Sequence, residues 1–62
     1  MSGSSTSDEA RNLAHEAAEE LKGGNKDEAA FLAEEARALD PKAAAEALKQ
    51  DGAERALREK KG

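Results

Sequence analysis

The sequence predicts an all-α protein, a small bundle of three to four short helices. Alanine, leucine, glutamate and lysine, which favour helices, make up most of the 62 residues, and valine and isoleucine are absent. Apolar residues recur at the three- and four-residue spacing of one helix face. Gly-Gly-Asn, Asp-Pro and Asp-Gly divide the chain and are typical of helix ends. We therefore expect one helical domain over residues 6–62.

The first helix is expected over residues 7–22, after a disordered Ser/Gly tail at residues 1–5. Thr6 and Glu9 have the spacing of a capping box, which satisfies backbone N–H groups in a first helical turn. Two glycines then end the helix, because glycine readily adopts the left-handed conformation of a C-terminal cap. The apolar stripe consists of Ala10, Leu13, Ala14, Ala17 and Leu21.

The second helix is expected over residues 26–39. Asn25 and Glu28 repeat the capping-box spacing. The connection from the first helix is so short that the two should form an antiparallel αα-hairpin. The apolar stripe consists of Ala29, Leu32, Ala33, Ala36 and Leu39.

The third helix is expected over residues 41–50, where Asp40 is a favourable N-cap and proline suits the first helical position. A break near Gly52 then precedes a short fourth helix at about residues 53–60. Leu48 and Leu57 are nine residues apart, or about 900° around an ideal helix, so one straight helix could not bury both against one surface. The expected cap of the fourth helix is Asp51, with Glu54. The alternative is one continuous, kinked helix.

The predicted core is thin. Large apolar side chains are few, so the fifteen alanines must pack closely or a second chain must complete the core. One contiguous core is expected from Leu13, Leu21, Leu32, Leu39 and Leu48.

Composition and charge exclude several classes of protein. Without cysteine there is no disulfide and no thiolate chemistry. We find neither a signal peptide nor an apolar run of the roughly 18 residues that a membrane span needs, so we expect a soluble chain and assign no location. The net charge is −4, with ten acidic and four basic residues in 1–40 but four and six in 41–62. Because the chain is acidic, we expect no nucleic-acid partner.

No group of side chains has the pattern of a catalytic, cofactor or metal site. His15 and Glu19 are spaced to share a metal ion, but two ligands are too few. The adjacent glutamates at 19–20 and at 34–35 could suggest acid–base chemistry. Adjacent side chains point about 100° apart on a helix, however, so neither pair shares a site. We therefore predict no catalytic residue, cofactor or metal ligand.

Phe31 is the most informative single residue, with Leu57 as its expected neighbour. It points about 160–200° away from the apolar stripe of the second helix. Either the fourth helix covers it, with Leu57 against the ring, or it is exposed and anchors a partner. We favour the internal position, because lone aromatic residues in small proteins usually belong to the core.

A glycine, a short turn, Asp-Glu-Ala, spaced alanines and a closing Leu-Asp-Pro occupy residues 24–41. This order resembles the second half of a tetratricopeptide repeat. The resemblance implies a helical hairpin, and arrays of such repeats bind peptides in a concave groove. The first half departs from the family, with Leu13, Glu16 and Glu20 where tryptophan, leucine and tyrosine are favoured.

The restricted alphabet, the caps and the Asp-Pro joint also look like de novo designed helical mini-proteins. We therefore expect a designed structural scaffold with no biochemical activity, no cofactor and no required partner. The alternative is a protein–protein interaction module. It would form a homo-oligomer or hold a partner helix through Phe31 and alanine-lined faces.

Overall fold

The computed structural model describes the backbone of residues 2–58 and the side chains of residues 6–57. The described residues form four helices and no strand, which confirms the predicted all-α fold. The second and third helices have the bounds expected from the sequence, and the expected end of the fourth, 59–60, lies outside the described residues. The helices are α1 (Ser2–Lys22), α2 (Lys26–Leu39), α3 (Pro41–Gln50) and α4 (Ala53–Arg58).

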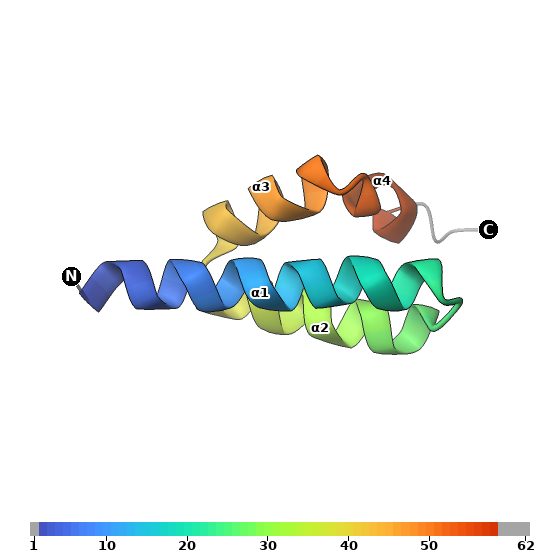
Figure 1. Ribbon diagram of the computed structural model, residues 1–62, viewed down its shortest axis with the longest axis horizontal. Helices are drawn as coiled ribbons and strands as arrows, with labels where there is room; N and C mark the ends of the chain where they lie inside the picture. The colour runs from blue at the N-terminus through green and yellow to red at the C-terminus, as the bar shows by residue number, and fades with distance from the viewer. Residues whose placement is uncertain (1, 59–62) are drawn as a thin grey trace.

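Two layers make up the bundle (Figure 1). The long helices α1 and α2 lie side by side and antiparallel, and α3 and α4 follow each other along another side of α1. Helix α3 packs against both α1 and α2, and α4 contacts all three other helices. The molecule is elongated, with extents of 40 × 17 × 15 Å.

The start of α1 differs from the sequence prediction. The helix begins at Ser2 rather than at residue 7, so four residues of the expected disordered tail are helical, and Met1 lies outside the described residues. Thr6 therefore lies within α1 and not at its first turn. Serine is only a moderately poor helix former, and extending an existing helix avoids the cost of nucleation. This end of α1 extends beyond the other helices (Figure 1).

The turn between α1 and α2 uses a glycine cap. Gly24 has a φ of +91°, in the left-handed region that favours glycine, and the Asn25 backbone N–H donates to the Glu20 carbonyl oxygen at 2.9 Å. The capping box predicted at Asn25 and Glu28 is wrong. The Asn25 side-chain Nδ2 donates to Glu20 Oε1 at 2.8 Å instead and makes no cap hydrogen bond to α2. The side chain is thus held toward Glu20, and its Oδ1 accepts no backbone N–H of α2.

Asp40 joins α2 to α3 without a loop. Its extended backbone (φ −153°, ψ 98°) ends one helix and begins the next. Its Oδ1 accepts a hydrogen bond from the Ala43 backbone N–H at 3.3 Å, so the predicted N-cap is confirmed. Its Oδ2 accepts a second hydrogen bond, from the Ser7 hydroxyl of α1 at 3.0 Å. One carboxylate thus links three helices.

Acid should weaken this joint. The Ala43 N–H and then the Ser7 hydroxyl lower the pKa of Asp40 below its ordinary value of 3.8. Because the pKa of Asp40 is lower in the folded chain than in the unfolded chain, the ionised carboxylate stabilises the fold. This stabilisation is complete above the pKa of the unfolded chain and is lost as the pH falls through the pKa of the folded chain. Between about pH 5 and pH 2, we expect the thermal midpoint of Asp40→Asn to fall by less than that of the parent chain. Equal losses in the two proteins would contradict this role, and Ser7→Ala should give an intermediate loss.

The break between α3 and α4 is present, as predicted. Helix α3 ends at Gln50 and α4 begins at Ala53, so the alternative of one kinked helix is wrong. Gly52 has a φ of +72° and its N–H donates to the Lys49 carbonyl oxygen at 3.1 Å. The turn changes the direction of the chain, which lets Leu48 and Leu57 both pack on the core.

Gly52→Ala should destabilise the fold by about 1 kcal/mol, because alanine disfavours a positive φ. A Cβ at this position would meet nothing within 4 Å, so the cost is conformational and not steric. Urea titration measures the change. Gly23→Ala is the matched control, since its Cβ would make only ordinary contacts, the nearest at 3.6 Å to the Glu20 carbonyl oxygen. A stabilised Gly52→Ala variant would contradict the left-handed turn.

Alanine forms most of the core. Of the twelve buried apolar residues within 6–57, eleven are alanines and the other is Leu48, which is fully buried. Four leucines pack around this centre but are only partly buried. They are Leu13, Leu21, Leu32 and Leu57.

The prediction that Leu39 belongs to the core is wrong, since its side chain is 38% exposed. Ala29, Ala33 and Ala36 define the buried side of α2. Leu39 lies about 90° around the helix from the middle of that side. It is also the last residue of α2, where the chain turns away into α3. Its position on the helix therefore leaves Leu39 at the edge of the core.

Leu48→Ala should cost about 2–5 kcal/mol, the usual range for a buried leucine, and should unfold much of a domain this small. Leu39→Ala, with the same change in volume, should cost clearly less, about 1 kcal/mol, because the side chain is only partly covered. Circular dichroism during urea titration would measure both. Equal losses in the two variants would contradict the core described above.

Candidate interaction surface

Phe31 lies on the outside of α2, with 59% of its surface exposed. The favoured prediction, that α4 and Leu57 cover the ring, is wrong. Leu57 packs against the core instead and lies beside Ala30, Ala33 and Arg37 on another side of α2. The helical spacing had placed Phe31 opposite the apolar stripe, and the structure keeps it there. Phe31 and Leu57 therefore do not form one site.

The exposed face of α2 around Phe31 is apolar at its centre. Phe31, Ala38 and Leu39 line a shallow depression of about 390 Å³ together with Glu34 and Glu35. Phe31 and Leu39 are the two large apolar side chains that are exposed among the described residues. We call this the α2 outer face.

Four carboxylates surround Phe31 on its own helix. They stand three and four residues before and after it, which are the positions of nearest neighbours on a helix surface. All four residues are exposed. They are Asp27, Glu28, Glu34 and Glu35. The α2 outer face therefore combines an apolar centre with a negative rim.

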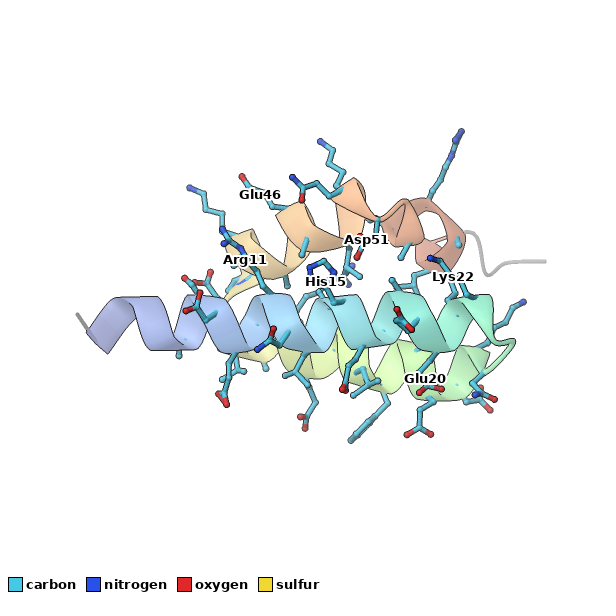
Figure 2. The ribbon with its side chains drawn as sticks, viewed as in Figure 1. Arg11, His15, Glu20, Lys22, Glu46 and Asp51 are labelled. Atoms are coloured by element: carbon cyan, nitrogen blue, oxygen red, sulfur yellow. The ribbon has the colours of Figure 1, made fainter. Side chains whose placement is uncertain are left out.

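His15 forms a link that the sequence did not predict. Its Nδ1 lies 2.7 Å from Asp51 Oδ2, between α1 and the turn that ends α3. Figure 2 shows the His15 ring directed from α1 toward Asp51. Asp51 was expected to cap α4, but it ends α3 and its side chain pairs with His15. The two residues are 36 positions apart, so only the tertiary fold could bring them together.

The outer side of α3 and α4 carries charges of both signs. Its groove, of about 750 Å³, is lined by Lys42, Lys49 and Arg55, with Glu46 and Glu54 among them. In Figure 2, Glu46 points away from α1. The mixture of signs gives this groove no preference for one charged ligand.

Within residues 6–57, no three His, Asp or Glu side chains gather closely enough to hold a metal ion, and His15 pairs with Asp51 rather than with Glu19. None of the described helices is long and apolar enough to cross a membrane. Every side-chain polar atom that is buried in this part of the chain has a hydrogen-bond partner.

Comparison with models of protein families, with curated proteins and with solved structures finds no match to this chain. The resemblance of residues 24–41 to a tetratricopeptide repeat therefore stays a prediction. The exposed residues themselves are the remaining basis for a functional proposal.

Proposed function

We propose that the chain is a designed structural scaffold with no enzymatic activity. The observation that carries this proposal is the composition of its core. All four helices contribute to a single cluster that is almost entirely alanine, as Ala14, Ala33, Ala44 and Ala53 illustrate. Each joint between helices also carries its own cap or glycine. Such agreement between local signals and global packing is the aim of design and supports this origin.

Sedimentation equilibrium tests the scaffold proposal. A scaffold that is complete in one copy should sediment at its monomer mass of 6.5 kDa, and its thermal midpoint should not change with protein concentration. A midpoint that rises with concentration would show that folding depends on a second copy, and the proposal would fail.

A second candidate function is that of a protein–protein interaction module. The exposure of Phe31 favours it, because an exposed aromatic ring adds little to folding and is a common anchor at interfaces. The buried alanine faces and Leu57 already serve the core, which leaves the α2 outer face as the interaction surface.

Phe31→Ser tests this second candidate. Since the ring is exposed, the variant should keep the free energy of unfolding within about 0.5 kcal/mol of the parent chain and should lose binding. Urea titration and a binding assay measure the two effects separately. A large loss of stability would instead assign Phe31 a role in folding.

A further inference from the structure

We propose that the α2 outer face binds a basic amphipathic helix, with Phe31 as the apolar anchor and the four carboxylates as the charged rim. This inference rests on the second candidate function and names the class of partner.

The apolar centre has the form of a strip along the helix axis. Phe31, Ala38 and Leu39 stand at positions i, i+7 and i+8, so they share one side of α2 over two turns. This strip is about 12 Å long, which matches two turns of a partner helix. Anchors at such spacing are typical of helices that bind with their apolar side against an apolar surface. The strip therefore favours an amphipathic helix over a single small molecule.

The rim determines the charge of the partner. Asp27, Glu28, Glu34 and Glu35 all lie within about 60° of Phe31 around the helix axis. The two cations of α2, Lys26 and Arg37, lie more than 100° from Phe31 around the helix axis. Arg37 lies beside Leu57 and Glu34, at the edge of the rim. A lysine or arginine side chain could pair with the rim and place its cation over the Phe31 ring. The negative sign of the rim thus selects a basic partner.

The same rim opposes a symmetric dimer. A two-fold axis through the α2 outer face would bring the carboxylates of one copy against those of the other, so like charges would meet. A second copy could offer the groove of α3 and α4 instead. However, that groove carries Glu46 and Glu54 among its cations, so its charge complements the rim poorly. We therefore assign the surface to a different, basic helix.

The test uses a synthetic amphipathic Leu/Lys peptide of roughly 14 residues, or four turns. Its binding to the parent chain is measured by fluorescence anisotropy at several salt concentrations. A Leu/Glu peptide of the same length is the probe of opposite charge. We expect the Leu/Lys peptide to bind, and the affinity to fall with rising salt because exposed ion pairs are screened. Amide chemical-shift changes in the parent chain should be confined to α2 around Phe31.

Three variants separate the contributions to binding. Phe31→Ser should weaken binding about tenfold or more, as for an anchor residue. The double variant Glu34→Gln/Glu35→Gln should weaken it several-fold and flatten its dependence on salt. The matched control, Glu46→Gln/Glu54→Gln, removes the same charge from α3 and α4 and should stay within about twofold. Circular dichroism checks that each variant is folded.

Each other outcome overturns the inference. Equal losses in the two double variants would mean that only net charge matters. Binding of the Leu/Glu peptide in preference, with a requirement for Phe31, would refute the basic partner but leave the interaction function standing. Self-association that requires Phe31 would assign the surface to a second copy. If neither peptide binds, the inference fails, and the second candidate function loses its support with it.

Discussion

Close packing of alanine side chains is the constraint on which the rest of this structure depends. An alanine presents only one methyl group, so two helices with facing alanines can approach until their backbones limit the distance. The stability of such a contact then depends on how closely the two helix surfaces fit, and not on the burial of large side chains. A bundle with one fully buried leucine can hold together only if every helix keeps its small-residue side turned inward. The joints between the helices must therefore set their directions accurately.

The joints meet this demand by different means. Asp40 serves both neighbouring helices and also reaches α1 through Ser7, so the direction of α3 is tied to both members of the hairpin. The pair of His15 and Asp51 holds the far end of α3 near α1. Both contacts lie at the edge of the alanine core, where water is close, and each contributes modestly. Their main effect is to orient the helices.

Much of this fold could be predicted from local signals. Asp40 and Gly52 were informative because a cap or a left-handed turn depends on neighbouring residues alone. Asn25 was misleading because its side chain had a second partner, Glu20, across the turn. Leu39 was assigned to the core as a member of the apolar stripe of the second helix, although its angular position placed it at the edge of the buried side. The errors arose at residues for which two environments were possible, namely two hydrogen-bond partners for Asn25 and core or edge for Leu39.

The candidate surface was predictable in part. Helical spacing predicted that Phe31 lies opposite the apolar stripe. The acidic residues around it were not predicted as a rim, although they follow from the same spacing. Whether α4 would cover the ring depended on the direction of the chain after Gly52, which no local signal specifies. The link between His15 and Asp51 joins residues 36 positions apart and likewise needed the assembled fold.

The alanine core also has a thermodynamic consequence. The heat capacity change of unfolding grows with the apolar surface that becomes exposed, and an alanine exposes less than a leucine or phenylalanine. A core of this composition should therefore have a small heat capacity change for its length. The curve of stability against temperature becomes flatter, since its curvature is set by that quantity. Such a protein reaches only a modest maximum stability but keeps most of it over a wide range of temperature.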